Sequence, residues 1–400
     1  MSEDLWTIKE HIISASHIRG FNRGVRDEQN GHLRLSVKQY TPKVDPGYIS
    51  LIVAHGIGSS KELYEPLLDE ILRRGLPIRS AWSMDVAHHG QSYLLNEAII
   101  GDEPHWLDSA RDMLHFVNHF QAQMPPPIYG IGQSWGCCNI LMMSSFHSRL
   151  FAGMFMMEPT FETGHQLQTY DQSAPMKNGE ARPVLIARRR DVWPSRKEAR
   201  VRLLKSPYYA SYDPRVFERF IKYSLRDRPT PEQPDAVTLT TPKAQEIYTF
   251  CRPDPPFPGF TQAPDYKNRS KETVLVPGFY RAEVMYFKRA LRETYPPVLY
   301  LWGTISDIGN SAYLERIINQ TGVGDEGGGG VLAGQVVSKY IEGGDHLIPY
   351  KMPGRAAEAI AEWLRVELEK WNGEAKKARD QPPFYPGALN PLWLERLSKL

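Results

Sequence analysis

The sequence alternates short apolar runs with helical patterns, and this alternation restricts the fold more than any other feature of the chain. The apolar runs end in turn residues and cover 48–56, 76–85, 126–134, 151–159, 296–304 and 335–344. Between them lie segments with apolar residues at three- and four-residue intervals, namely 60–75, 105–124 and 136–150. Strands that alternate with helices predict βαβ units, and therefore an α/β fold with a mostly parallel central sheet flanked by helices.

The alternation stops between residues 162 and 290, where polar, proline-containing and helix-like stretches replace the apolar runs. We therefore expect an inserted, mainly helical cap over 162–290. The α/β core is predicted in two parts, over 1–161 and 291–375, and a C-terminal tail follows over 376–400. An amphipathic helix over 354–371 is expected to close the sheet, and the glycine-rich stretch 324–330 is expected to be a loop.

Composition indicates an ordinary soluble protein that resides in a reducing compartment. Hydrophobic residues make up 41% and charged residues 24% of the chain. Forty-eight Lys and Arg against 46 Asp and Glu leave a net charge of +2, which argues against a general nucleic-acid binder. No window approaches 18 consecutive apolar residues, so no membrane span is expected. Cys137, Cys138 and Cys251 are odd in number and include an adjacent pair, which argues against a disulfide framework.

The five residues 132–136, Gly-Gln-Ser-Trp-Gly, fit the pattern G-x-S-x-G. This pattern marks a nucleophilic serine only where a strand precedes the serine and a helix follows it. Both are predicted here, because the apolar run 126–134 leads into Ser134 and the helical segment 136–150 follows. Gly132 and Gly136 would remove the side chains that clash in such a sharp turn. The sequence therefore predicts that Ser134 is a catalytic nucleophile.

A serine nucleophile needs a base and an acid that orients the base, in the chain order serine, acid, histidine. His346 follows the apolar run 335–344 in a loop after two glycines, and it is predicted to be the base. Two carboxylates end neighbouring strands and could supply the acid: Glu158 and Asp307. Asp307 follows the penultimate strand and Glu158 follows the strand after the nucleophile, so spacing alone leaves both open.

Acyl transfer also needs hydrogen-bond donors for the developing oxyanion. The backbone N–H of Trp135, directly after the nucleophile, is expected to supply one donor. The loop "HGIGSS" after the first predicted strand is expected to supply the second through Ile57.

Two adjacent histidines, His88 and His89, look at first like metal ligands. Side chains of neighbouring loop residues diverge, however, and no third ligand stands at a useful spacing, so no metal site is predicted. Asp85, at the end of the preceding strand, is expected to cap a turn.

The chain ends in Ser398-Lys399-Leu400, the tripeptide that the peroxisomal import receptor recognises. The first residues, "MSEDLWTIKE", are acidic where a secretory signal is basic. We therefore expect a protein of the peroxisomal matrix, and the import receptor as a partner.

These motifs resemble the fungal α/β-hydrolases of the toxin-biosynthesis type, which include AK-toxin biosynthesis proteins and a peroxisomal acyl-CoA hydrolase of mycophenolic acid biosynthesis. The resemblance is carried by residues 55–67, 85–97, 110–120, 126–136, 157–161, 188–199 and 301–308, and by the terminal tripeptide. It implies an α/β-hydrolase fold and hydrolysis of an acyl-CoA thioester in specialised metabolism. A carboxylesterase, lactonase or acyltransferase with the same triad is the alternative enzyme, and a non-catalytic ligand-binding protein that keeps the hydrolase fold is the alternative of another class. Coenzyme A would enter as part of the substrate, with no separate cofactor, and a homodimer is a candidate assembly.

The resemblance also favours one acid. Glu158-Pro159 occupies the position from which the family takes its triad acid, although the family more often has aspartate there. This moves the preference to Glu158, with Asp307 as the alternative.

The predicted cap carries a cluster of cations and aromatic residues that could contact such a substrate. Arginines suit phosphates, so Arg188, Arg189 and Arg190 are candidates for binding the phosphates of coenzyme A, with Arg196 and Lys197 nearby. A solvated face is the alternative interpretation. The aromatic residues could line an acyl pocket or pack in a core: Trp193, Tyr208, Tyr209 and those of "PPFPGF" at 255–260.

Overall fold

The computed structural model describes residues 2–27, 31–44, 46–161, 182–253, 274–276, 279–308, 311–380, 387 and 389–400. The chain divides into two compact units, Met1–Ala361 and Glu362–Leu400, and each is treated by itself. Among the described helices, none is long and apolar enough to cross a membrane.

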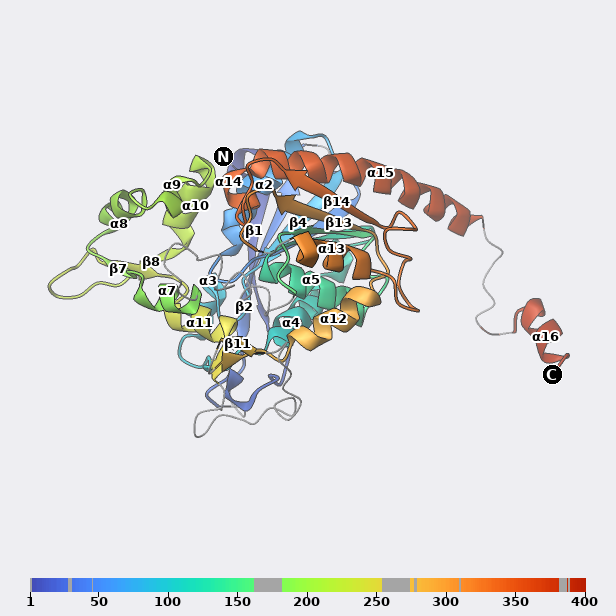
Figure 1. The fold of residues 1–400 in the computed structure, drawn as a ribbon, viewed down its shortest axis with the longest axis horizontal. Helices are drawn as coiled ribbons and strands as arrows, with labels where there is room; N and C mark the ends of the chain where they lie inside the picture. Colours follow the sequence, from blue (N-terminus) through green and yellow to red (C-terminus); the bar gives the residue numbers. More distant parts are fainter. Residues whose placement is uncertain are drawn as a thin grey trace. The chain divides into compact units, whose positions relative to one another are not determined.

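The first unit is built on an eight-stranded sheet with the order β1-β2-β4-β3-β5-β6-β13-β14 (Figure 1). The strands span β1 (Trp6–Ser14), β2 (Arg34–Pro42), β3 (Ile49–Ala54), β4 (Ile78–Met84), β5 (Ile128–Gln133), β6 (Gly153–Met157), β13 (Val298–Gly303) and β14 (Val336–Ile341). From β4 to β14 every pairing is parallel, whereas β1–β2 and β2–β4 are antiparallel. All six strands predicted from the apolar runs are present, and β1 and β2 are additional.

Burial explains why the central strands were predicted and β1 was not, whereas β2 is mostly buried but has polar residues such as Lys38 and Gln39 between its apolar ones. Every residue of β3, β5, β6 and β13 is buried, as expected for parallel strands covered on both faces. In β1 most residues are partly or fully exposed, so the strand carries no continuous apolar run. The edge position of β1 in the sheet accounts for this difference.

Helices cover both faces of the sheet: α4, α5 and α12 lie on one side, and α2 and the start of α15 lie on the other (Figure 1). The helices of the core span α1 (Ser2–Leu5), α2 (Glu65–Arg73), α3 (Gly90–Asn96), α4 (Trp106–His119), α5 (Trp135–Phe146), α12 (Val284–Arg292), α13 (Ser311–Gln320), α14 (Ile348–Lys351) and α15 (Pro353–Arg379). Short 3-10 turns span η1 (Asn22–Gly24), η2 (Lys61–Tyr64) and η3 (Gln121–Gln123). The helix predicted over 354–371 is therefore longer than its apolar pattern indicated.

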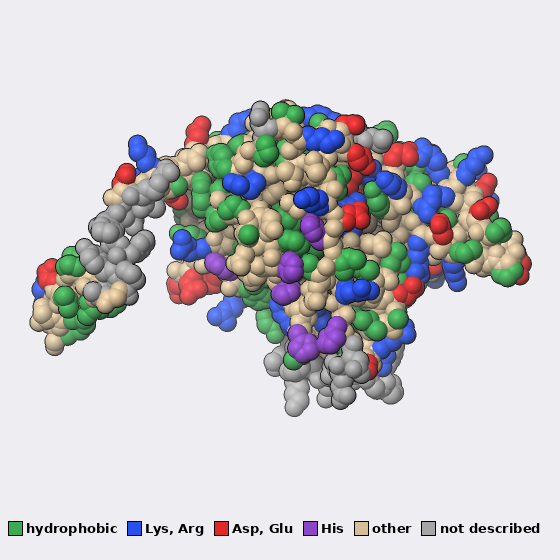
Figure 2. All heavy atoms as spheres, turned by 180° about the vertical axis from the view of Figure 1, so that it is seen from behind, with side chains coloured by type: hydrophobic (Ala, Val, Ile, Leu, Met, Phe, Trp, Pro, Cys, Tyr) green, Lys and Arg blue, Asp and Glu red, His purple; other side chains and the backbone are tan. Residues whose placement is uncertain are grey.

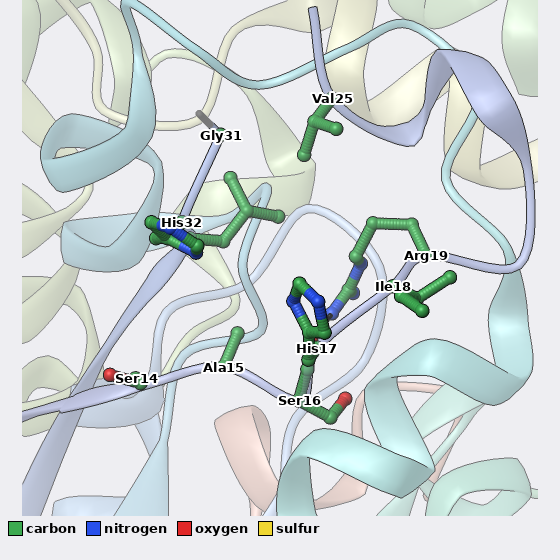
Figure 3. A pocket seen from close by; sticks show the side chains of 10 residues that line it. Ser14, Ala15, Ser16, His17, Ile18, Arg19, Val25, Gly31 and His32 are labelled. Atoms are coloured by element: carbon green, nitrogen blue, oxygen red, sulfur yellow. Dashed lines mark hydrogen bonds between the residues drawn. The ribbon is translucent and has the colours of Figure 1, made fainter. Parts of the chain in front are cut away.

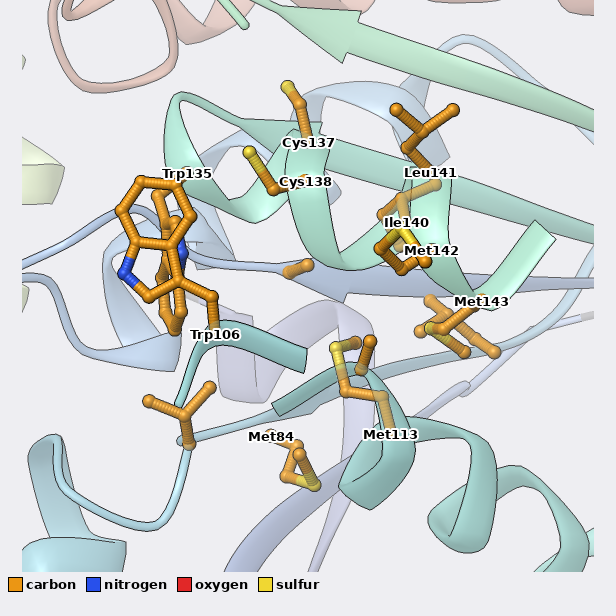
Figure 4. Close-up of a cluster of buried hydrophobic side chains, with 14 of the residues drawn as sticks. Met84, Trp106, Met113, Trp135, Cys137, Cys138, Ile140, Leu141, Met142 and Met143 are labelled. Carbon is orange, nitrogen blue, oxygen red and sulfur yellow. The ribbon is translucent and has the colours of Figure 1, made fainter. Parts of the chain in front are cut away.

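The core between α4, α5 and the sheet is filled by aromatic and sulfur-containing side chains (Figure 4). The rings of Trp106 and Trp135 meet edge to face with centroids 6.0 Å apart. Residues 135–144 of α5 are all buried, as in a helix that is apolar all round. Cys137 and Cys138 are unpaired thiols in this core, and burial raises the pKa of both.

Short helices and a small antiparallel sheet of order β7-β9-β8 follow β6 in the described chain. They span α7 (Arg182–Arg188), β7 (Val192–Trp193), α8 (Arg196–Leu203), α9 (Pro207–Ala210), α10 (Pro214–Tyr223), β8 (Leu225–Asp227), β9 (Val237–Leu239) and α11 (Lys243–Phe250). A second small sheet, β10-β12-β11, consists of β10 (Arg252–Pro253), β11 (Val274–Val276) and β12 (Phe279–Tyr280). We use the word cap for residues 182–250.

The cap is attached to the core by polar and apolar contacts. Asp213 caps α10 by accepting from the backbone N–H of Arg215, and Pro214 occupies the first position of the helix. From α10, Arg219 reaches Glu65 of α2, with 2.7 Å between Nε and Oε2.

The helix α12 begins within the predicted range of the insertion, yet its apolar residues pack in the core beside α5.

The second unit contains the later part of α15 and the short helix α16 (Pro391–Leu397). Leu392, Trp393 and Leu394 of α16 are exposed. The terminal tripeptide 398–400 follows the helix directly and is also exposed.

Candidate active site

Ser134 stands at the turn between β5 and α5, where the strand passes abruptly into the helix. Its φ is +54° and its ψ is −122°, a conformation that residues with a Cβ rarely adopt. A Cβ at Gly136 would lie 2.1 Å from the carbonyl oxygen of Ala54, so only glycine allows this close approach. The structure therefore contains the strand, strained turn and helix that the pattern around Ser134 requires.

His346 lies in the loop after β14 and contacts this serine. Its Nε2 lies 2.9 Å from Oγ of Ser134. A hydrogen bond from the motif holds this loop in place: Nε2 of Gln133 donates to the carbonyl oxygen of His346 at 3.0 Å. Gln133 is the variable residue before the serine in the motif, and nothing in the sequence pattern indicated this contact.

The two carboxylates that the sequence left open have different partners. Oε2 of Glu158 lies 3.5 Å from Nδ1 of His346. The Glu158 carboxylate is fully buried and accepts from the backbone N–H of Gly303 and from Oγ of Ser306. Asp307 instead forms an ion pair with Arg182 of the cap, with 3.0 Å between Oδ2 and Nη2, and its side chain is 58% exposed. The structure thus brings Glu158, and not Asp307, beside the histidine.

Buried histidines hold the loop that contains Ile57. Nε2 of His89 accepts from the backbone N–H of Gly58 at 2.9 Å, and Nε2 of His55 accepts from that of Val86 at 3.1 Å. Each ring must therefore be unprotonated at Nε2. Burial lowers the pKa of His55 and, more strongly, that of His89, which agrees with neutral rings. Among the described residues, the backbone N–H of Ile57 has no acceptor.

Tyr64 connects this loop to the nucleophile turn. Its hydroxyl accepts from the backbone N–H of Gly56 and donates to Oε1 of Gln133, both at 3.1 Å. It also lies 2.7 Å from the hydroxyl of Tyr350, which in turn lies 2.7 Å from Oγ of Ser59. Tyr64 is fully buried, so these bonds are shielded from water. The two tyrosines are far apart in sequence, and no motif indicated their meeting.

Asp85 is buried and accepts three hydrogen bonds. Its donors are the backbone N–H and Nζ of Lys61, at 2.8 and 2.6 Å, and the backbone N–H of Gln91 at 2.9 Å. Within the described part of the chain, no group of three or more His, Cys, Asp or Glu is arranged to hold a metal ion. His88 and His89 instead pack beside Trp135.

The serine and histidine open into a cavity of about 710 Å³ between core and cap. Its lining includes Ile57, Tyr208, Tyr209, Leu185 and Phe250, besides Ser134 and His346. Trp193 is buried outside this lining, and residues 255–260 lie outside the described chain.

The three consecutive arginines of the cap lie in different environments. Arg189 lines the cavity and pairs with Glu246, whereas Arg188 and Arg190 are exposed. Arg196 holds the cap together, because it donates to the carbonyl oxygens of Ile221 and Leu225.

A second cavity, of about 470 Å³, lies at the N-terminal segment and is lined by His17, Arg19 and His32 (Figure 3). It shares none of its lining with the cavity at Ser134 and His346. Histidine side chains are visible on the face seen from behind (Figure 2). The rings of His17 and His32 have centroids 6.1 Å apart. No third ligand joins them within the described residues.

Comparison with known proteins identifies a family and several relatives of this chain. A model of the alpha/beta hydrolase family matches residues 51–362. The chain is 32% identical to the type I acyl-CoA thioesterase mpaH of Penicillium roqueforti (strain FM164), over 95% of this chain and 93% of that protein. It is 26% identical to the abhydrolase domain-containing protein AFT2-1 of Alternaria alternata, over 62% of this chain and 87% of that protein. The resemblance to fungal hydrolases of this type is thereby confirmed.

The fold is also found among solved structures. The peroxisomal alpha-beta-hydrolase Lpx1 from Saccharomyces cerevisiae aligns with a TM-score of 0.67 at 15% identity, covering 99% of this chain and 97% of that one. At this identity the likeness shows the fold alone, and the predicted α/β-hydrolase fold class is confirmed.

Proposed function

The chain belongs to the alpha/beta hydrolase family, and on this premise we propose that it is a serine hydrolase that cleaves acyl-CoA thioesters through an acyl-enzyme on Ser134. The observation that carries the proposal is the 2.9 Å contact between Nε2 of His346 and Oγ of Ser134 at the wall of a substrate-sized cavity. The name of the Penicillium relative supports the thioester as the bond cleaved.

In the first half of the reaction, Nε2 of His346 takes the proton of Ser134 as Oγ attacks the thioester carbonyl carbon. The Glu158 carboxylate, the proposed acid of the triad, stabilises the imidazolium that forms and orients its ring. The 3.5 Å separation is long for a hydrogen bond, and contacts of this kind tighten when substrate binds.

The tetrahedral intermediate carries its negative charge on the former carbonyl oxygen. We assign the backbone N–H groups of Ile57 and Trp135 to this oxyanion, assisted by the N-terminus of α5. The C–S bond then breaks, and His346 gives its proton to the departing coenzyme A thiolate. In the second half His346 deprotonates a water molecule, which attacks the acyl-enzyme. The bond between the acyl carbon and Oγ of Ser134 then breaks, Oγ takes the proton back from His346, and the acid is released.

The proposal includes substrate and location. The acyl group would come from specialised metabolism, and the exposed Arg188 and Arg190, next to cavity-lining Arg189, would contact phosphates of coenzyme A. The exposed tripeptide 398–400 would be bound by the peroxisomal import receptor, which places the enzyme in the peroxisomal matrix. A homodimer remains the candidate assembly.

The test compares acyl-CoA substrates with oxygen esters of the same acids, using purified protein. Release of free thiol and release of acid are measured for each pair. The proposal predicts a higher kcat/KM for thioesters. Equal or faster cleavage of the oxygen esters would contradict the assignment to acyl-CoA.

A further inference from the structure

An ion pair with a buried carboxylate, in the wall of the catalytic cavity, has no part in the mechanism above. Arg189 follows α7 and Glu246 belongs to α11, so the pair joins two helices of the cap. The guanidinium binds both carboxylate oxygens: Nη1 donates to Oε1 at 3.2 Å and Nη2 donates to Oε2. This two-point geometry fixes the plane of the guanidinium.

The buried carboxylate of this pair sets it apart from the other ion pairs along the cavity. The Glu246 side chain is 7% exposed and that of Arg189 is 31% exposed, and burial raises the pKa of the Glu246 carboxyl, against the effect of Arg189. In the pair of Arg182 with Asp307 the carboxylate side chain is 58% exposed, and in the pair of Lys351 with Asp345 it is 27% exposed. Exposed carboxylates are screened by water, whereas the buried Glu246 holds the guanidinium of Arg189 in a fixed direction at the cavity wall.

The pair also lies next to the reacting centre. A Cβ built on Gly58 would come within 2.7 Å of Oε1 of Glu246, so the carboxylate contacts the loop that carries Ile57. Arg189 and Glu246 line both the main cavity and a smaller one of about 50 Å³ behind that loop. A bound thioester whose carbonyl points at Ile57 would therefore have further atoms within reach of Arg189.

Arg189 has N–H groups that Glu246 does not occupy. A guanidinium has five N–H groups, of which Glu246 takes two. Nε is buried without a partner in the described structure. Glu246 has already neutralised the charge of Arg189, so the remaining N–H groups favour an uncharged acceptor over an anion.

We propose that Arg189, held by Glu246, is a specificity-determining residue that donates to an uncharged oxygen acceptor of the substrate. The proposal rests on the proposed thioesterase function and replaces the phosphate role predicted for Arg189. The acceptor is an amide carbonyl of the pantetheine arm or a carbonyl, ether or hydroxyl oxygen within the acyl group. A polar group held in a fixed direction at the wall of a cavity is a usual means of orienting a ligand.

The test measures binding to the Ser134→Ala variant by calorimetry, so that it does not depend on turnover. Two acyl chains are used, one saturated and one of equal length with a keto group. Each is presented as the CoA thioester and as the pantetheine thioester, which keeps both amides of the arm and lacks the phosphates. In this background, Arg189→Met with Glu246→Leu replaces the pair by apolar side chains of similar size, a change that buried pairs often tolerate.

We expect the double substitution to weaken binding about tenfold for every ligand that carries the recognised oxygen. A loss confined to the two keto chains places the acceptor in the acyl group, and an equal loss for all four ligands places it in the pantetheine arm. A loss confined to the two CoA thioesters would show that Arg189 binds phosphate and would overturn the proposal. Equal affinities with and without the pair for all four ligands would overturn the proposal. Arg200→Gln with Glu218→Gln, which removes an exposed ion pair of the cap, is the matched control and should change none of them.

A single substitution provides an independent arm if the double variant does not fold. Glu246→Gln keeps the size of the side chain and leaves Arg189 charged and uncompensated. An acyl-CoA whose acyl chain ends in a carboxylate should then bind the Glu246→Gln variant about tenfold more tightly than it binds the Ser134→Ala parent. No gain would overturn the proposal. Failure of the thioesterase function would be seen separately, as absence of turnover by the unsubstituted enzyme.

Discussion

Oε2 of Glu158 lies 3.5 Å from Nδ1 of His346, and the same carboxylate is held by Gly303 and Ser306. Glu158→Gln should therefore reduce kcat by about a thousandfold or more, because the amide cannot stabilise the imidazolium. Asp307→Asn should change kcat by less than about twofold, since it removes only an exposed ion pair. Steady-state kinetics on both variants checks this. A large loss in the Asp307 variant with a small one in the Glu158 variant would reverse the assignment of the acid.

Tyr64→Phe should lower both stability and kcat. The substitution leaves the buried N–H of Gly56 without its acceptor, at a cost of about 1–3 kcal/mol in the free energy of unfolding. It should lower kcat more than it changes KM, because the loop carrying Ile57 loses its support. Tyr300→Phe is the control: its buried hydroxyl bonds Thr321, outside the cavity lining. If both variants lose stability but neither loses kcat, Tyr64 has no positioning role.

The buried histidines predict a loss of stability in mild acid. Burial holds the pKa of His88 and His89 well below 6.5, and that of His55 is also lowered. Below about pH 6.5 the unfolded chain therefore binds protons that the folded chain does not bind, so the free energy of unfolding falls as the pH drops. Above this pH these histidines add no pH dependence to the free energy of unfolding. Each such histidine contributes a slope of up to about 1.4 kcal/mol per pH unit.

Urea unfolding at pH 7.5 and 5.5 measures this slope. His89→Gln should reduce it by about one proton, since a glutamine oxygen can still accept from Gly58 but does not titrate. An unchanged slope in this variant would show that His89 does not contribute.

Lys61→Met should be strongly destabilising. Lys61 and Asp85 are both buried, with 2.6 Å between Nζ and Oδ2. Burial lowers the pKa of Lys61, but Asp85 and Glu62 outweigh this effect and raise it above its usual value. Removing the cation leaves Asp85 uncompensated, at about 3–5 kcal/mol, as measured by denaturant unfolding. Asp85→Asn in the same chain should recover part of the loss, and a double variant no more stable than the single one would contradict the pairing.

The sequence predicted the parts of this protein that depend on local patterns. Central strands buried on both faces read as apolar runs, and the turn at Ser134 has its own signature in the flanking glycines. His346 could be proposed from the sequence because the order of serine, acid and histidine restricts the base to the end of the chain, and its Nε2 lies 2.9 Å from Oγ of Ser134. The edge strand β1 carries no such signal because most of its residues are exposed, and in β2, which lies inside the sheet, polar residues such as Lys38 interrupt the apolar ones.

The contacts that support the site depend on residues distant in sequence. Glu158 and Asp307 could not be separated from spacing, because both follow strands at the same end of the sheet. Their partners distinguish the two carboxylates. Gly303 and Ser306 donate to Glu158, whereas Arg182 of the cap forms an ion pair with Asp307. The pairing of Arg189 with Glu246 likewise joins two cap helices, and the run of three arginines gave no indication of it.

The central claim is the acyl-enzyme on Ser134, and intact-protein mass measurement during turnover tests it most directly. Mixing the enzyme with an acyl-CoA and quenching before steady state should give one equivalent of free thiol. The protein mass should rise by one acyl group, located on the peptide containing Ser134, and Ser134→Ala should show neither. Thiol release by Ser134→Ala at the rate of the unsubstituted enzyme, or an acyl group on another residue, would contradict it.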